Sequence, residues 1–354
     1  MTEVPRLGCP VCGSSSSSHA VDAASGRERD ATGGFGAALG SRRRRALLLG
    51  TATAAAGAVG VASVSRPRTD GGTDSASAGE SPERTTDPTL IAHRGFAGEN
   101  PENTRAAARA ATREEGPGRR ADLVEVDVVP TADGDVVAFH DDELSGRDDG
   151  LGLTDETGVV WETDTETVTS AEVLRSGETV PRLGELLESI PADVGVNVEL
   201  KNPGSTSLRF AEKLDEDALE AQRSVWRPFV ERVVEILDGH DHEVLFSSFY
   251  EAALAVASER STASLAPILW ESVADGVAIA EAYDADAVHP PAAMVPGTPF
   301  FDDARFGGTD LVRTARDRGW AVNAWTVDSW YRADRLLDAG VDGLIADYST
   351  LVRE

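Results

Sequence analysis

Histidine and arginine side chains stand at the ends of two short apolar stretches of the chain. "TLIAH" ends in His93 and is followed by Arg94, and "VVAFH" ends in His140. Imidazole titrates near neutral pH, so one ring can accept a proton while a second ring donates one. The forked guanidinium of Arg94 suits the paired oxygens of a phosphate. Brought together, these residue types could carry out acid–base chemistry on a phosphate ester.

Acidic side chains alternate with apolar ones in two further stretches. "LVEVDVV" holds Glu125 and Asp127, and "VNVELK" ends in Glu199 and Lys201. Residues two apart on a strand face the same side, and a buried carboxylate is costly unless it is paired or binds a cation. Because carboxylate oxygens suit Mg²⁺ or Ca²⁺, we predict one divalent cation at Glu125, Asp127 and Glu199. The alternative is a solvated strand end, or a simple charge pair between Glu199 and Lys201.

Short apolar runs and helical patterns alternate after residue 88. The predicted strands are 89–93, 123–129, 136–140, 195–200, 243–249, 264–269, 286–290, 321–327 and 342–347. The helical patterns are 103–115, 182–190, 208–237, 253–259, 311–318 and 329–339. Such alternation predicts a parallel sheet.

One of the nine strand candidates does not belong to the parallel set. Only "TADGD" separates 123–129 from 136–140, and a parallel crossover needs about a dozen residues, so these two strands must be antiparallel. Eight strands remain, which predicts a (β/α)₈ TIM barrel with catalytic residues at the carboxyl ends of its strands. A doubly wound open sheet is the weaker alternative, because no glycine-rich dinucleotide loop follows the first strand. We expect residues 144–180, too long for an ordinary loop and too polar for a core layer, to form a small insertion over the barrel mouth.

Four segments with different compositions divide the chain. Residues 1–40 are rich in Gly, Ser and Ala and are predicted to be disordered, and 66–87 form a polar linker. Segment 41–65 begins "SRRRRALLLG" and resembles a twin-arginine export signal, although it lies far from Met1. Residues 88–354 form the barrel domain. We expect an exported or cell-surface protein, weakly associated with or anchored in a membrane if the signal is retained; the alternative is a cytoplasmic protein.

The composition is strongly acidic. Asp and Glu number 61 against 33 Lys and Arg, which gives a formal net charge of −28. Such a surface resembles that of proteins from salt-accumulating halophiles, and it argues against nucleic acid as a partner. Cys9 and Cys12 in "CPVCG" are spaced like half of a zinc site, but a structural site needs four ligands. The sequence does not specify an oligomeric state.

Five motifs in order carry a resemblance to a known family. "IAHRG…PENT", "VEVDV…TADG…VVAFHDDEL", "VNVELK", "AVNAWTVD" and "GVDGLIADYS" resemble the successive motifs of the glycerophosphodiester phosphodiesterase family. The match runs from about residue 90 to residue 349. The family's fold is a (β/α)₈ barrel with an insertion after the second strand, which agrees with the strand count above.

The resemblance implies a role for each motif residue. It implies that the acid–base pair is His93 and His140 and that the ligands of a divalent cation are Glu125, Asp127 and Glu199. The phosphate would be contacted by Arg94 and Lys201. Trp325 would line the site, and Glu102 would support it. Asn103, in "PENT", is expected to cap the following helix. Phe249, in "FSSFY", is expected to be core rather than to stack on a substrate.

The resemblance also implies an activity, which is metal-dependent hydrolysis of a small glycerophosphodiester to glycerol 3-phosphate and an alcohol in glycerophospholipid metabolism. The neighbouring glycerol hydroxyl would attack the phosphorus and form a cyclic phosphate that water opens; direct attack by water is the competing route. Two functional alternatives are a phospholipase D-like or phosphoinositide-type enzyme acting on intact lipids, which would need an exposed apolar or basic rim, and a non-catalytic surface binding barrel. After "HDDEL" the chain departs from the Arg-Thr-Thr type sequence of the family, and His289 replaces an Asn.

Overall fold

A computed structural model describes residues 87–146 and 152–352. The predicted disordered extension, twin-arginine segment and linker, with Cys9 and Cys12, lie outside these residues. Part of the departure from the family after "HDDEL" lies outside them too. Within the described ranges, no helix is both long and apolar enough to cross a bilayer.

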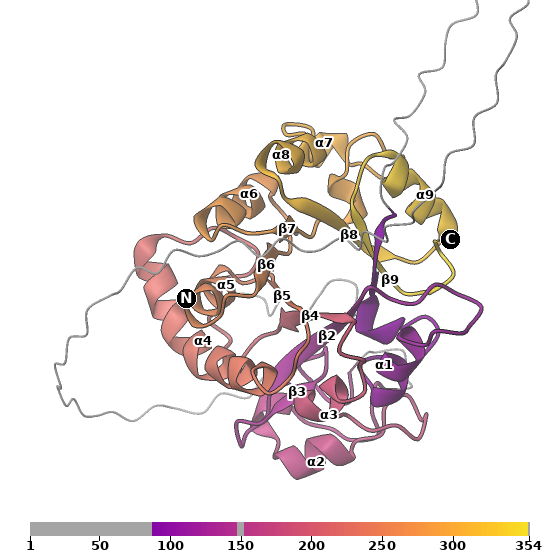
Figure 1. Cartoon of the computed structure of the whole chain (residues 1–354). Helices are drawn as coiled ribbons and strands as arrows, with labels where there is room; N and C mark the ends of the chain where they lie inside the picture. Colours follow the sequence, from indigo (N-terminus) through magenta and orange to yellow (C-terminus); the bar gives the residue numbers. More distant parts are fainter. Residues whose placement is uncertain (1–86, 147–151, 353–354) are drawn as a thin grey trace, which may run out of the picture. The chain divides into compact units, whose positions relative to one another are not determined.

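Eight parallel strands form a nearly closed barrel (Figure 1). In spatial order they are β6 (Ser264–Pro267), β5 (Val244–Ser248), β4 (Gly195–Leu200), β2 (Leu123–Pro130), β1 (Thr89–Ala92), β9 (Gly343–Ala346), β8 (Ala321–Val327) and β7 (Ala287–Val288). A parallel bridge between Ile268 and His289 joins β6 to β7 where each of these two strands ends. The predicted (β/α)₈ fold is confirmed.

The ninth strand, β3 (Val136–Ala138), pairs with β2 outside the barrel. The pairing is antiparallel and places Val128 opposite Ala138, as the short "TADGD" turn predicted. The amide of Phe139 donates to the carbonyl of Asp127 at 3.0 Å. This bond returns the chain to the carboxyl end of β2, so His140 lies beside the carboxylates of that strand.

Helices surround the barrel and connect its strands (Figure 1). They are α1 (Arg105–Ala111), α3 (Leu183–Leu187), α4 (Glu216–Leu237), α5 (Glu251–Arg260), α6 (Val273–Ala282), α7 (Asp303–Phe306), α8 (Leu311–Arg318) and α9 (Trp330–Asp338). The long helix begins at Glu216, and the prediction that it begins at Leu208 is wrong. The Asp215 side chain accepts from the amide of Ala218 and caps the helix there, because a carboxylate at this position satisfies a free backbone amide. Residues 208–214 are therefore a loop.

The side chains of the strands divide between two apolar cores. Outward-facing residues such as Val196 and Val198 pack with Trp226 and Val230 of α4 in the main core. A smaller cluster fills the floor of the barrel: Ile91, Leu123, Leu245, Ala266, Ala287 and Ile345. Leu123 lies on the same face of β2 as Glu125 and Asp127, because alternate residues of a strand share a face. The carboxylates therefore stand directly above an apolar floor.

The insertion after β3 has a core of its own. It contains a short 3₁₀ turn at Val160–Glu162 and helix α2 (Thr165–Ser170). Ten buried side chains pack together in it: Val129, Val137, Phe139, Leu144, Leu153, Val160, Val168, Ala171, Val173 and Val180. The expectation that this segment is too polar for a core layer is therefore wrong, because its scattered apolar residues gather on the outer face of the β2–β3 hairpin.

Gly95 occupies a position that no other residue type fits well, between Arg94 and the chain that leads to α1. Its φ is +80°, and a Cβ there would lie 2.7 Å from Cβ of Ala107 in α1. We expect Gly95→Ala to lower the free energy of unfolding by about 1–3 kcal/mol, because it adds both backbone strain and a clash. Gly116→Ala is the control, since a Cβ there meets nothing within 4 Å. Equal denaturant midpoints for the two variants would contradict this interpretation.

Candidate active site

Three carboxylates converge at the carboxyl ends of β2 and β4. Asp127 and Glu199 are direct neighbours in the parallel pairing, and Glu125 stands one step below them on β2. One oxygen from each residue lies within 4.8 Å of the others, and all three side chains are buried. The structure therefore brings together the three residues that the sequence predicted as cation ligands.

Two cations contact these carboxylates. Arg94 Nε lies 3.1 Å from Oδ2 of Asp127, and its Nη1 donates to Oε1 of Glu102 at 2.8 Å. Lys201 Nζ lies 3.0 Å from Oδ1 of Asp127 and pairs with Glu199 as well. Burial would lower the pKa of Arg94 and of Lys201, but the neighbouring carboxylates outweigh burial and raise both values. Both side chains are thus permanently charged.

The charges of this cluster do not balance. With all four carboxylates ionised, four anions (Glu102, Glu125, Asp127 and Glu199) would stand against two cations (Arg94 and Lys201), and four minus two gives a formal excess of two negative charges. Burial, with the charges of Asp127 and Glu199, raises the pKa of Glu125 well above its usual range. Oε1 of Glu125 is also buried and finds no hydrogen-bond partner in the described part of the chain. A divalent cation would balance the excess negative charge and give the unpartnered oxygen a ligand bond, so these residues fit a divalent cation.

The surroundings of Asp127 shift its pKa in the opposite direction to that of Glu125. Burial would raise the pKa of its carboxyl group, but Lys201 and Arg94 outweigh burial and hold that pKa well below its usual range. The side-chain Nδ2 of Asn103 also donates to Oδ2 of Asp127 at 2.8 Å. Asp127 is therefore a fixed anion at the centre of the cluster.

Each histidine at the rim has a carboxylate partner. Nδ1 of His93 lies 2.6 Å from Oδ1 of Asp347, which directly follows β9, and Nδ1 of His140 lies 2.5 Å from Oδ1 of Asp141. An ionised carboxylate only accepts, so each Nδ1 carries a proton and each Nε2 is left for other chemistry. Neither aspartate was predicted from the sequence to be a site residue. The signal available for Asp347 was its place at a strand end in "DGLIAD".

The protonation of His140 follows from its surroundings. Burial, with the positive charges of Arg94 and Lys201, lowers the pKa of His140 to about 4. The imidazole is therefore neutral at pH 7, and with Nδ1 protonated its Nε2 is a free proton acceptor.

The "PENT" segment supports the site, but Asn103 has a different role from the one predicted for it. Thr104, not Asn103, caps α1, because its hydroxyl accepts from the amide of Ala107. Asn103 adopts a left-handed backbone (φ 55°) and uses both ends of its amide on Asp127: Nδ2 donates to Oδ2, and Oδ1 accepts from the Asp127 amide at 3.2 Å. The expected cap at Asn103 is wrong, whereas Glu102 contacts Arg94 as expected.

Trp325 and His289 occupy neighbouring strands on the other side of the barrel. The indole Nε1 of Trp325 donates to the carbonyl of His289 at 2.7 Å, which fixes the ring at the mouth. His289 is fully buried, its Nε2 lies 3.1 Å from Nδ2 of Asn323, and burial lowers its pKa to about 3. His289 thus lies in the layer beneath the mouth.

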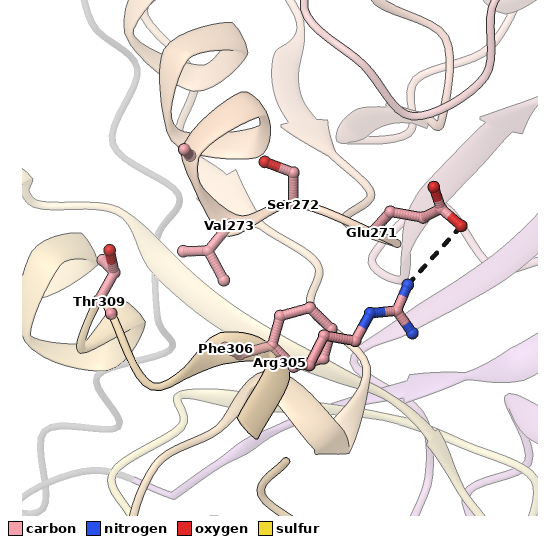
Figure 2. Close-up of a pocket in the computed structure, with 8 residues that line it drawn as sticks. Glu271, Ser272, Val273, Arg305, Phe306 and Thr309 are labelled. Atoms are coloured by element: carbon pink, nitrogen blue, oxygen red, sulfur yellow. Dashed lines mark ion pairs between the residues drawn. The ribbon is translucent and has the colours of Figure 1, made fainter. Parts of the chain in front are cut away.

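A separate cavity of about 210 Å³ lies beside the start of α6 (Figure 2). Its charged side chains are Glu271 and Arg305, which form an ion pair at 3.7 Å. None of the residues that line it belongs to the histidine and carboxylate cluster. The cluster at the barrel mouth is therefore the candidate active site.

Comparisons with known proteins agree with this assignment. The model of the "Glycerophosphoryl diester phosphodiesterase family" matches residues 93–351. The chain is 31% identical over 281 residues to "Probable glycerophosphodiester phosphodiesterase 2" of Mycobacterium tuberculosis, covering 75% of this chain and 89% of that protein. It is 28% identical over 265 residues to the glycerophosphodiester phosphodiesterase of Caldanaerobacter subterraneus, covering 73% of this chain and 93% of the relative.

A solved structure shows the same fold. It is that of an Oleispira antarctica phosphodiesterase in complex with the product sn-glycerol-3-phosphate, with a TM-score of 0.56 and 27% identity, covering 74% of this chain and 94% of that chain. The family match covers most of the chain, and the five sequence motifs lie within or at the edges of the matched residues. The chain therefore belongs to the glycerophosphoryl diester phosphodiesterase family and is a phosphoric diester hydrolase, as its sequence predicted.

Proposed function

We propose that this enzyme hydrolyses small glycerophosphodiesters to glycerol 3-phosphate and an alcohol with the help of one divalent cation, as part of glycerophospholipid metabolism. The observation that carries the proposal is the pairing of two carboxylate-bound histidines with a buried cluster in which carboxylates outnumber cations by two. The product named in the Oleispira antarctica complex, sn-glycerol-3-phosphate, is consistent with this substrate class.

Glu125, Asp127 and Glu199 would hold the cation. Their oxygen-only donor set suits Mg²⁺ or Ca²⁺ rather than a metal that prefers sulfur or nitrogen ligands. When bound, the cation would polarise a phosphoryl oxygen and neutralise charge that develops on the phosphate. Arg94 and Lys201 flank the cluster and would contact the same phosphate, while Glu102 holds the Arg94 guanidinium in place.

The two histidines would divide the proton transfers between them. His140 is neutral and presents Nε2 as an acceptor, so it is the better base. His93, held at Nδ1 by the Asp347 carboxylate, would then be the proton donor.

In the first step the glycerol hydroxyl next to the phosphate would lose its proton to His140 as its oxygen attacks phosphorus. The bond from phosphorus to the alcohol oxygen then breaks, and His93 gives that oxygen a proton. In the second step water opens the cyclic phosphate with the roles of the rings reversed, which regenerates both. Direct attack by water remains the competing route, and trapping of a cyclic phosphate during turnover would decide between them.

Action on intact lipids is the second candidate, and one observation favours it. Trp330 and Tyr331, at the start of α9 just beyond the carboxyl end of β8, are 69% and 47% exposed. Tryptophan and tyrosine are common where a protein meets a lipid surface. A non-catalytic binding barrel is disfavoured, because all the proposed catalytic and ligand residues are present. Turnover of lysophosphatidylcholine in preference to glycerophosphocholine would favour the lipid candidate.

Removal of the cation provides the first test of the activity. In high-salt buffer, we expect chelation to reduce release of glycerol 3-phosphate from glycerophosphocholine at least about a hundredfold, and Mg²⁺ or Ca²⁺ to restore it. The same ion should raise the thermal midpoint of the chelated wild type, because a ligand that binds only the folded state stabilises it. Glu125→Gln should lose both effects. Glu235→Gln, at an exposed pair with Arg232, is the control and should keep them.

Substitutions at the histidine pairs test the acid–base assignment. We expect His93→Ala and His140→Ala to lower kcat about 10²- to 10⁴-fold. Asp347→Asn should lower kcat about 10- to 100-fold, because it leaves His93 poorly oriented. His240→Ala, at a histidine just before the amino end of β5, should leave kcat unchanged. A kcat of His93→Ala within a few-fold of the wild-type value would sink the mechanism.

Export is a separate proposal, which rests on the twin-arginine resemblance of 41–65 alone. Replacing Arg44 and Arg45 with Lys should retain the protein inside a host that has this export pathway, because the pathway reads the arginine pair. The measurement is the distribution of the protein between cells and medium. Unchanged secretion would favour another route, and wild-type protein found only inside cells would favour the cytoplasmic alternative.

A further inference from the structure

Four aromatic rings stand together at the barrel mouth, and one of them, Trp325, was described above. All four are half-buried, including Phe249, which was expected to be core. Phe249 stacks on Phe210 with centroids 4.7 Å apart, and Trp270 stacks on Trp325 at 5.7 Å with an interplanar angle of 17°. Phe249 also meets both tryptophans edge-on, at 5.6 Å to Trp325 and 6.3 Å to Trp270. We call these four rings the aromatic wall. Its members follow or end strands β4, β5, β6 and β8, so it spans one side of the mouth.

The aromatic wall adjoins the catalytic cluster directly. Lys201 Nζ, which contacts Asp127 and Glu199, lies 5.8 Å from the centroid of the Phe249 ring. A phosphate held by Lys201 would therefore have one of its two ester substituents next to the wall.

The wall is held in place by polar contacts behind it. Besides the Trp325 indole bond to His289, the amide of Ala211 donates to the carbonyl of Phe249 at 3.0 Å. The buried carboxylate of Glu251 accepts from the Leu214 amide at 2.5 Å and from Lys213 Nζ at 2.6 Å. These bonds fix the loop that carries Phe210. Rings that are both rigid and half exposed form a preorganised binding surface.

The charge around the wall favours a cation. Aromatic faces attract cations through their negative π surface. Tyr250 packs edge-on against Phe210 at 5.5 Å. Two carboxylates, Asp142 and Glu199, lie within electrostatic reach of this ring, against the one cation Lys201. A polyol would need several hydrogen bonds that the four rings do not supply, since the Trp325 N–H is already used.

We propose that the aromatic wall receives the alcohol portion of the diester and selects alcohols that carry a quaternary ammonium group. The inference rests on the proposed function and narrows it to choline-type glycerophosphodiesters. Phe210 and Trp270 are specificity-determining residues in this account, because they touch neither the phosphate-binding nor the proton-transferring groups.

The test compares three substrates: glycerophosphocholine, its neutral 3,3-dimethylbutyl isostere and glycerophosphoglycerol. For Trp270→Ala and Phe210→Ala we expect KM for glycerophosphocholine to rise about tenfold with kcat nearly unchanged. KM for glycerophosphoglycerol should change less than twofold. Trp270→Phe keeps a ring and should keep most of the selectivity, and Trp330→Ala, outside the wall, is the control. Unfolding curves check that each variant is folded.

Two results would overturn the proposal: equal KM changes for all three substrates, or a wild type that prefers the neutral isostere. A binding measurement separates this proposal from the proposed function. Calorimetric binding of glycerophosphocholine to catalytically impaired His140→Ala should weaken about tenfold when Trp270→Ala is added. If Trp270→Ala weakens binding but the wild type hydrolyses no diester, the proposal for the aromatic wall stands and the proposed hydrolytic function is wrong. If binding is unaffected by Trp270→Ala, the wall proposal fails whatever the activity.

Discussion

Carboxylates outnumber cations by two in the barrel mouth, and this formal imbalance is the constraint on which the site depends. Burying carboxylates costs several kcal/mol each unless opposite charges lie close by, and Arg94 and Lys201 supply only part of that compensation. The raised pKa of Glu125 and its unpartnered Oε1 mark the remaining deficit. Burial, together with these two cations, lowers the pKa of His140 and keeps its ring neutral. The proposed cation binding, phosphate contact and proton transfer thus depend on one arrangement of charges.

The barrel makes this arrangement possible by geometry. The two-residue period of β2 stacks Glu125 and Asp127 above an apolar floor, and the parallel pairing with β4 sets Glu199 beside them. The β2–β3 hairpin then returns His140 to the same rim. Gly95, with its left-handed backbone, lets the chain turn sharply after Arg94, whose own amide donates to Oε2 of Glu125 at 2.7 Å. These buried charges and the left-handed turn lower the stability of the fold, and they hold the site residues in place before a ligand binds.

Local patterns in the sequence predicted the parts of this arrangement that depend on period and turn length. The strands, the antiparallel hairpin and the convergence of Glu125, Asp127 and Glu199 all follow from those two features. Contacts between distant segments could not be predicted: His93 and Asp347 are 254 positions apart, and only barrel closure brings them together. The start of α4 was missed because the apolar residues Leu208 and Phe210 continue the helical pattern before the Asp215 cap. Leu208 packs against the main core instead, and Phe210 stands in the aromatic wall.

Calorimetric titration of the chelated protein with Mg²⁺ and with Ca²⁺ shows whether the carboxylate cluster binds one divalent cation. We expect saturable binding of at least one of the ions at one site per chain in wild type, and no binding in the double variant Asp127→Asn and Glu199→Gln. Absence of binding in the wild type, or equal binding in the double variant, would contradict a cation site at these residues.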